Sequence, residues 1–186
     1  MKRTSALASL IAVVAAVPAA SVPAAAAAAA PGPRAGRASA DSDYRVVRLR
    51  NLNSGRCMGA EGGTPANGTR VIQWTCTGSG DQAWYVNFDG SYSEVVNFRR
   101  GPGSTDACLG VSGGVTTQGA QMVTWQCDGK ANQQWRVEGS SECGGVILVN
   151  ASAGMLASVE GRSTANGASV IQWPHGSTRD QTWCVE

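Results

Sequence analysis

The sequence predicts an all-β fold built from three repeats of about 50 residues. All six tryptophans fall in three pairs, ten residues apart within a pair, and the pairs are offset by 51 and 48 residues. Beyond residue 40 the apolar residues occur in short runs separated by Gly, Asn, Asp and Ser, without helical periodicity, which is typical of strands and turns. The repeat period is the feature that any predicted fold has to reproduce.

The first 40 residues are expected to lie outside the fold. Lys2 and Arg3 precede a short apolar run and an alanine-rich tract, the pattern of a secretory signal peptide over residues 1–30. Two prolines interrupt the apolar stretch, which argues against a transmembrane helix. Residues 31–40 have the Pro- and Gly-rich composition of a flexible linker, so the folded domain is predicted at residues 41–186.

The net charge depends on that leader. Four of the 15 basic residues and none of the 13 acidic residues lie in the first 40 positions, which leaves 11 basic residues against 13 acidic ones. A domain with this balance lacks the basic surface that nucleic-acid binding requires, so no nucleic-acid partner is expected.

The cysteines agree with export. One pair in the first repeat and one in the second are each 19 residues apart at equal positions, which favours short-loop disulfides in an oxidising compartment. The two remaining cysteines would join the start and the end of the third repeat. No Cys-x-x-Cys pair and only one histidine are present, which argues against a zinc site. The predicted disulfides are Cys57–Cys76, Cys108–Cys127 and Cys143–Cys184.

Each repeat is expected to hold four strands. In the first copy, apolar runs predict strands at residues 45–50, 57–60, 70–75 and 83–87. Tight turns are predicted at Ser54-Gly55 and at Asn-Gly pairs, because both residues of such a pair tolerate positive φ. The second kind of turn recurs as Asn67-Gly68, Gln118-Gly119 and Asn166-Gly167, and the repeats span about residues 44–86, 92–137 and 141–186.

About twelve strands in an open sheet would leave unpaired edges. Closure into a threefold, barrel-like arrangement removes those edges. Propeller blades have a similar length, although three blades are fewer than the usual four to eight. The length of the repeat alone does not distinguish a β-trefoil from a β-propeller.

The end of each repeat resembles a known motif. Three Gln-x-Trp copies are similar to the repeated motif of the ricin-B-type lectins, a family that includes the carbohydrate-binding modules of many bacterial secreted glycosidases. Cys57-Met58-Gly59-Ala60 and Cys108-Leu109-Gly110-Val111 support the resemblance, which covers residues 44–186. It implies a β-trefoil, in which three hairpins form a barrel and three cap it. The copies are Gln82-Ala83-Trp84, Gln133-Gln134-Trp135 and Gln181-Thr182-Trp183.

The resemblance implies different roles for the two tryptophans of each pair. The second tryptophan would lie in the core and supply large apolar area, and the motif glutamine would tie the backbone of its own repeat. The first falls where the family places the ring on which a sugar lies; the alternative is that it only covers the barrel. The core set is Trp84, Trp135, Trp183, Gln82, Gln133 and Gln181, and the sugar-facing set is Trp74, Trp125 and Trp173.

A flat aromatic ring suits the C–H face of a pyranose, and carboxylates or amides suit its hydroxyls. The family places an acid two residues after the first motif cysteine, where our alignment has Gly59, Gly110 and Ala157. The same alignment puts Met155 and His175 at the two cysteine positions of the third repeat. Candidate substitutes for the acid are Asp81, Asn132 and Asp180, which directly precede the motif glutamines, with Glu61 and Glu160 near the missing acid.

Carbohydrate binding without catalysis is the expected function. The chain has a single histidine and no Gly-x-Ser-x-Gly or nucleotide-binding motif, so no catalytic residue, cofactor or metal is assigned. The expected partner is a polysaccharide or glycan held at up to three shallow sites, and the protein is expected to be extracellular and monomeric, without a membrane span. The alternative is a trefoil that binds a protein such as a protease through its Pro- and Gly-rich loop, residues 98–106.

Overall fold

The computed structural model describes residues 43–101, 103 and 105–186. The predicted signal peptide and linker lie outside these residues. The described part contains thirteen strands, six short 3-10 helices and no α-helix. The 3-10 helices are η1 (Glu61–Gly63), η2 (Gly80–Gln82), η4 (Ser112–Gly114), η5 (Ala131–Gln133), η6 (Glu160–Arg162) and η7 (Arg179–Gln181).

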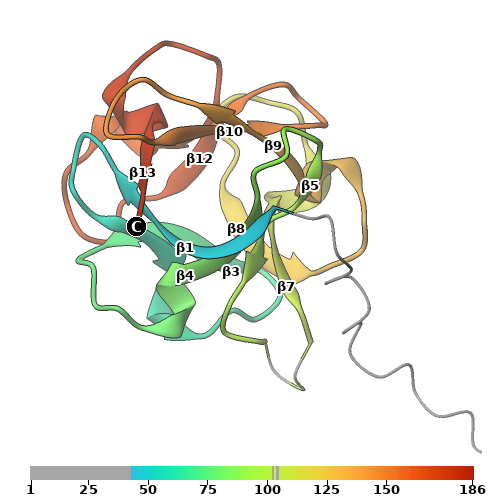
Figure 1. Cartoon of the computed structure of the whole chain (residues 1–186). Helices are drawn as coiled ribbons and strands as arrows, with labels where there is room; N and C mark the ends of the chain where they lie inside the picture. The colour runs from blue at the N-terminus through green and yellow to red at the C-terminus, as the bar shows by residue number, and fades with distance from the viewer. Residues whose placement is uncertain (1–42, 102, 104) are drawn as a thin grey trace, which may run out of the picture. The chain divides into compact units, whose positions relative to one another are not determined.

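The barrel closes through a ring of antiparallel pairings. β1 pairs with β4 on one edge and with β13 on the other, so the first and last strands of the fold lie side by side (Figure 1). The ring continues from β4 to β6, from β5 to β9, from β9 to β10 and from β10 back to β13. The strands are β1 (Tyr44–Asn51), β4 (Ala83–Asn87), β5 (Ser93–Glu94), β6 (Val96–Asn97), β9 (Gln134–Gly139), β10 (Val146–Asn150) and β13 (Trp183–Val185).

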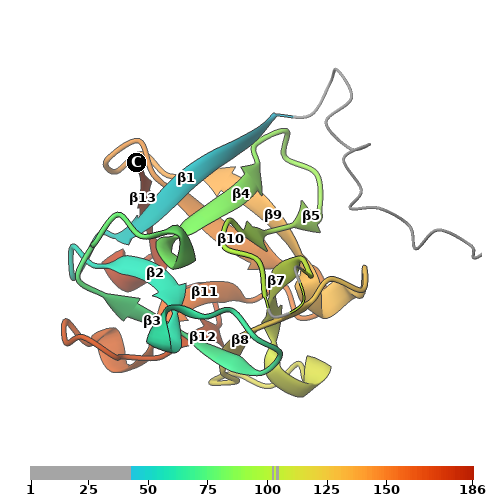
Figure 2. The same cartoon turned by 90° about the horizontal axis from the view of Figure 1, so that it is seen from below.

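Three further hairpins cap the barrel. Figure 2 shows their strands gathered beneath β1, β4 and β9. The caps also pair with one another, through Thr69 opposite Thr124 and through bridges from Ile72 to Ser169 and from Gln121 to Ile171. The hairpins are β2 (Cys57–Ala60) with β3 (Thr69–Trp74), β7 (Ala107–Val111) with β8 (Met122–Gln126), and β11 (Leu156–Val159) with β12 (Val170–Trp173).

This arrangement is the predicted β-trefoil. The four strands predicted in the first repeat agree with the observed ones to within one residue at each end. The thirteenth strand arises in the second repeat, where the first strand is interrupted at the buried Val95 and becomes β5 and β6. Apart from that interruption, each repeat has four strands.

The second tryptophan of each pair joins the barrel to the cap. Trp84, Trp135 and Trp183 are fully buried. Each indole nitrogen donates to the carbonyl of the residue 26 positions earlier, at 3.0, 2.8 and 3.0 Å respectively. Because those carbonyls lie in the first strand of each cap hairpin, one side chain fills the core and also satisfies its polar group there.

The motif glutamines clamp the loop that follows the first tryptophan. Gln82 accepts from the backbone nitrogen of Thr77 at 2.8 Å and donates to the carbonyl of Thr75 at 3.0 Å. Gln133 and Gln181 make the same pair of bonds in their own repeats. A buried amide with both ends satisfied fixes the loop between the two tryptophans.

The cysteine pairs expected from the spacing are bonded. Cys57 is joined to Cys76, Cys108 to Cys127, and Cys143 to Cys184 across 41 residues. In the chain-entropy description, the two 19-residue loops contribute roughly 3 kcal/mol each and the 41-residue loop roughly 4 kcal/mol, by restricting the unfolded chain.

The alignment of the third repeat was wrong by one residue. Leu156, not Met155, stands opposite Trp173, as Cys57 stands opposite Trp74. Ser158, not Ala157, therefore occupies the position of Gly59. Successive residues of a strand point to opposite faces. An alignment error of one residue therefore assigned a core residue, Ala157, to the position that faces the site.

Trp135→Ala and Trp125→Ala form a matched pair that tests the division of roles. We expect Trp135→Ala to lower the free energy of unfolding by about 3–5 kcal/mol, because it removes a buried ring and leaves the Leu109 carbonyl unpaired. Trp125→Ala removes an exposed ring and should cost about 1 kcal/mol or less. Urea denaturation monitored by circular dichroism measures both, and equal losses would contradict the division.

Candidate functional site

The first tryptophan of each pair is partly exposed at the outer surface of a cap. Trp74, Trp125 and Trp173 are 45%, 46% and 41% accessible. They follow buried residues on β3, β8 and β12, so the core anchors the strand and leaves the ring outside. The three rings therefore occupy equivalent positions on three repeats.

Each ring rests against a glycine from a different repeat. A Cβ added to Gly167 would lie 3.8 Å from the ring of Trp74, and one added to Gly68 would lie 3.8 Å from that of Trp125. Gly119 is placed in the same way at 3.7 Å from Trp173. These are the glycines of the predicted tight turns, with φ of 81–82°. Each turn thus supports the aromatic ring of another repeat.

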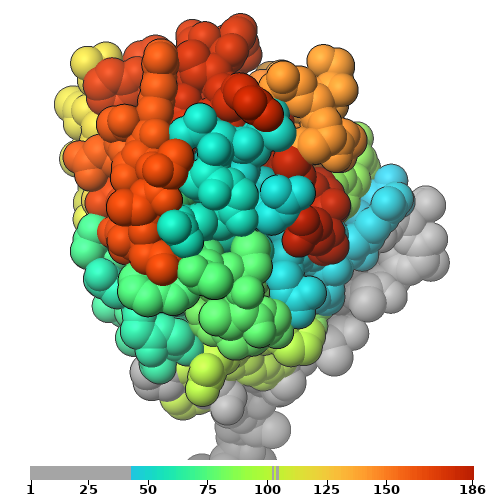
Figure 3. All heavy atoms as spheres, turned by 90° about the vertical axis from the view of Figure 1, so that its left-hand side faces the viewer, coloured from blue at the N-terminus to red at the C-terminus, as the bar shows by residue number. Residues whose placement is uncertain are grey.

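The residue before each ring holds that turn in place. Gln73 donates to the carbonyls of Ser163 and Ala165 at 2.8 and 2.9 Å, which ties the third repeat to the first. The two repeats abut in Figure 3, where the orange surface of the third meets the teal surface of the first. Equivalent bonds run from Gln172 to Val115 and Thr117 and from Thr124 to Ala66. Each site is therefore built from two repeats.

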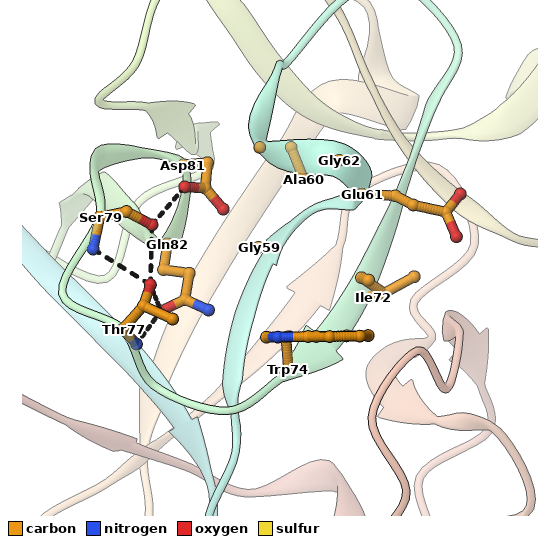
Figure 4. A pocket seen from close by; sticks show the side chains of 11 residues that line it. Gly59, Ala60, Glu61, Gly62, Ile72, Trp74, Thr77, Ser79, Asp81 and Gln82 are labelled. Atoms are coloured by element: carbon orange, nitrogen blue, oxygen red, sulfur yellow. Dashed lines mark hydrogen bonds between the residues drawn. The ribbon is translucent and has the colours of Figure 1, made fainter.

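A hollow of about 430 Å³ lies beside Trp74 in the first site. Its wall is formed by Gly59 on β2, the η1 residues, and Ser79 and Asp81 at η2, as Figure 4 shows. The equivalent hollow beside Trp125 has about 270 Å³ and includes Gly110, Lys130 and Asn132. Both hollows are open and join one aromatic face to a few polar groups.

Asp81 occupies the space that a side chain at position 59 would need. Its carboxylate is buried and accepts a hydrogen bond from the Ser79 hydroxyl (Figure 4). A Cβ added to Gly59 would lie 3.3 Å from Asp81 Oδ2 and 2.9 Å from Cγ of Gln82. A side chain at the expected acid position would therefore meet Gln82 first and then the carboxylate of Asp81, which comes from η2.

Glu61 lies in the same wall, but its carboxylate is paired with an arginine and is not directed at Asp81. Its carboxylate forms an ion pair with Arg70 at 2.9 Å and points away from Asp81 (Figure 4). Arg70 also donates to the Ser169 hydroxyl at 2.8 Å, so this pair lies at the junction with the third repeat. Glu160, its counterpart in the third repeat, is exposed at the start of η6.

The second site has an amide in place of the carboxylate. Asn132 donates to the carbonyl of Val111 at 3.3 Å, and its oxygen faces Gly114. The nearby Asp128 is paired with Lys130 at 2.7 Å. The hydrogen bond from the Lys130 side chain holds the pKa of Asp128 below its usual value, so this carboxylate stays ionised and committed to Lys130.

The third site has a serine at the position of the two glycines. Ser158 donates to Oδ2 of the buried Asp180 at 2.6 Å. Asp180 Oδ1 lies 3.6 Å from Nε of Arg162, which belongs to η6. Neither Ser158 nor Arg162 was identified from the sequence. The offset of 99 residues between Trp74 and Trp173 points to Ser158, whereas no sequence signal places Arg162 beside Asp180.

One group of three potential metal ligands occurs among the described residues, formed by Glu94, Cys108 and Cys127. The two cysteines are joined in a disulfide, so neither offers the thiolate that metal binding needs.

The ricin-type beta-trefoil lectin domain matches residues 45–183. The chain belongs to this family. The predicted resemblance is confirmed, and the match spans all three repeats of the fold.

Solved structures share the lectin-domain fold. The designed threefold-symmetric protein ThreeFoil has a TM-score of 0.68 at 28% identity, over 75% of this chain and 96% of that one. An exo-beta-1,3-galactanase from Clostridium thermocellum has a TM-score of 0.67 at 27% identity, over 75% of this chain but 29% of the galactanase. The ricin B-like lectin of Macrolepiota procera, in complex with lactose, has a TM-score of 0.62 at 15% identity over 79% and 97% of the two chains, which shows the fold alone. No curated protein sequence matches the chain.

Gly59→Asp tests whether the first site of this lectin domain can accommodate an acidic side chain on β2. We expect the substitution to lower the free energy of unfolding by about 1–3 kcal/mol, because Gln82 is clamped at both ends and cannot withdraw from the new Cβ. Gly139→Asp on β9 is the control, since a Cβ there meets nothing within 4 Å. Thermal unfolding of both variants gives the comparison. A Gly59→Asp protein as stable as the wild type would contradict this prediction, because it would show that the wall of the first site rearranges to accept the new side chain.

Proposed function

We propose that the protein is an exported, non-catalytic lectin that holds a polysaccharide or glycan at up to three shallow aromatic sites. The observation that carries this proposal is the threefold recurrence of an exposed tryptophan beside a polar residue of the 3-10 helix, which is a buried aspartate in two sites and the half-buried Asn132 in the other. Membership of the lectin family supports it. So do solved relatives of the same fold, such as the earthworm lectin domain in complex with GalNAc.

The geometry suits a sugar ring lying on each indole. The exposed ring offers an apolar face to the sugar C–H groups, and the polar residue of η2, η5 or η7 faces the hydroxyls. In the first and third sites this residue is an aspartate, which accepts hydroxyl protons. In the second site it is Asn132, which both donates and accepts.

Shallow sites of this kind bind single sugars weakly. Three of them on one rigid body strengthen the binding of a repeating glycan, because the first contact raises the effective concentration of sugar at the next. A polymeric or clustered ligand is therefore the proposed target. The protein acts as one chain with up to three sites.

The carboxylates of the sites are arranged for binding rather than hydrolysis. Glycoside hydrolysis typically needs two carboxyl groups on either side of the scissile bond. Asp81 and Asp180 belong to different repeats, and the carboxylate of Glu61 is paired with Arg70 and directed away from Asp81. His175 is exposed in the loop after Trp173.

Export is proposed from the three disulfides together with the signal-like pattern of the first 30 residues. Within residues 43–186, positions 102 and 104 aside, no helix has the length and hydropathy needed to cross a bilayer.

The triple variant Trp74→Ala, Trp125→Ala, Trp173→Ala tests the proposal. We expect the wild type to bind insoluble polysaccharides in a pull-down and defined glycans on an array, and the triple variant to lose at least tenfold in affinity. Its fold should persist, because all three rings lie outside the core. Tyr85→Ala with Phe98→Ala is the matched control, since these stacked aromatics are also exposed but lie outside the three ring positions.

Two results would contradict the lectin proposal. One is the absence of binding to any glycan, and the other is a triple variant that binds as tightly as the wild type. Capture of a secreted protease that depends on Phe98 and not on the three tryptophans would instead support the alternative of a protein-binding trefoil.

A further inference from the structure

The third site contains a buried acceptor without a hydrogen-bond donor. Asp180 is 4% accessible, and its Oδ2 is bonded to Ser158 at 2.6 Å. Its Oδ1 is buried and accepts no hydrogen bond from any described residue. Buried polar atoms are nearly always bonded, so an unbonded carboxylate oxygen needs a reason. Its pseudo-equivalent, Asp81, lines the hollow of the first site, and Asp180 holds the equivalent position on η7 of the third repeat.

Arg162 lies beside that oxygen in a backbone conformation that favours glycine. Its φ is 54°, and the equivalent residues of the other repeats are Gly63 and Gly114, with φ of 75° and 65°. A side chain in this region costs free energy, and such positions are often found where a ligand is held. Asn53 donates to the Arg162 carbonyl at 3.0 Å and holds the turn. The guanidinium stays 71% accessible, 3.6 Å from Asp180 Oδ1.

The first site also has a carboxylate and a guanidinium near the equivalent position, but its guanidinium belongs to another segment. A Cβ added to Gly63 would lie 3.8 Å from Asp81 Oδ1 and 3.9 Å from Nη1 of Arg99. Arg99 comes from the following repeat, so the guanidinium enters from a different segment. In the second site, where the polar residue is Asn132, the atoms within 4 Å of a Cβ on Gly114 all belong to Asn132. A guanidinium and a carboxylate therefore both lie near this position in the first and third sites, whereas the three nearest atoms in the second site belong to Asn132.

We propose that Arg162 is a specificity-determining residue of the third site, where it and Asp180 hold a neutral sugar through two adjacent hydroxyls. In this proposal the exposed Arg162 side chain swings off Asp180 Oδ1, which is buried in the structure. One hydroxyl then donates to that oxygen, and its neighbour accepts from the Arg162 guanidinium while the sugar ring lies on Trp173. Because Arg162 and Asp180 neutralise each other, an ionised sugar group would lose hydration here without a net opposite charge to compensate it. This inference rests on the proposed function and adds the ligand class and a residue that determines it.

The test uses the double variant Trp74→Ala, Trp125→Ala, in which only the third ring remains. The probes are galactose, lactose and N-acetylgalactosamine, with galacturonate as the acidic counterpart of galactose. Binding is followed by NMR titration of the Trp173 indole N–H signal. We expect at least one neutral probe to bind, and galacturonate to bind at least fivefold more weakly than galactose.

Arg162→Gly is the decisive variant in this background. It restores the residue found at positions 63 and 114, so it should fold at least as stably as its parent. We expect it to weaken binding of the neutral probe at least tenfold. Arg179→Ala is the matched control, because it removes one exposed arginine directly before Asp180 and should change binding less than twofold.

The outcomes separate the two levels of inference. Loss of all binding in the wild type would contradict the proposed function itself. If the wild type binds the neutral probes and the double variant does not, the third site does not bind sugar and the role proposed for Arg162 is wrong. Tighter binding of galacturonate than of galactose, or an Arg162→Gly protein that binds as tightly as its parent, would overturn the role of Arg162 alone.

Discussion

The hydrogen bond from each buried indole to a cap carbonyl is the contact on which the rest of the structure depends. Trp84, Trp135 and Trp183 fill the centre of the fold, and each spans 26 residues to reach the first strand of its own cap. The indole ring supplies buried apolar area, and its N–H fixes the position of the cap hairpin relative to the barrel. The clamp of the motif glutamine then fixes the loop that carries the site.

The second constraint is that no repeat completes a site by itself. The ring of Trp74 lies on the turn of the third repeat, that of Trp125 on the first, and that of Trp173 on the second. At the junction, the amide nitrogen of Gln121 lies within hydrogen-bond distance of carbonyls of Val71, Met122 and Val170, one from each repeat. A single two-stranded hairpin is marginally stable in water, and each site needs strands and turns from two repeats. The sites are therefore a property of the closed trefoil.

The scaffold is nearly threefold, whereas the sites differ. The core tryptophans and clamping glutamines are the same in every repeat. The polar residues beside the exposed rings are paired differently: Gly59 with Asp81, Gly110 with Asn132, and Ser158 with Asp180. A Cβ added to Gly59 or Gly110 would lie 2.9 or 3.0 Å from the motif glutamine, whereas Ser158 is accommodated in the third repeat and donates to Asp180. The sites therefore diverge in charge and hydrogen bonding, while the packing beneath them stays constant.

The sequence by itself determined the repeat, the strands and the disulfide pairs, because these follow from local periodicity and from residues at constant spacing. The division of the tryptophans followed from the resemblance of the Gln-x-Trp copies to the ricin-B-type lectins. The alignment misplaced the lost cysteine position of the third repeat by one residue, at Met155, although the offset of 99 residues between Trp74 and Trp173 points to Leu156, which pairs with Trp173. Tertiary structure alone decided that Glu61 pairs with Arg70 and that Arg162 lies beside Asp180. Long flexible side chains carry no periodic signal, and what they touch is set only when the barrel closes and brings distant loops together.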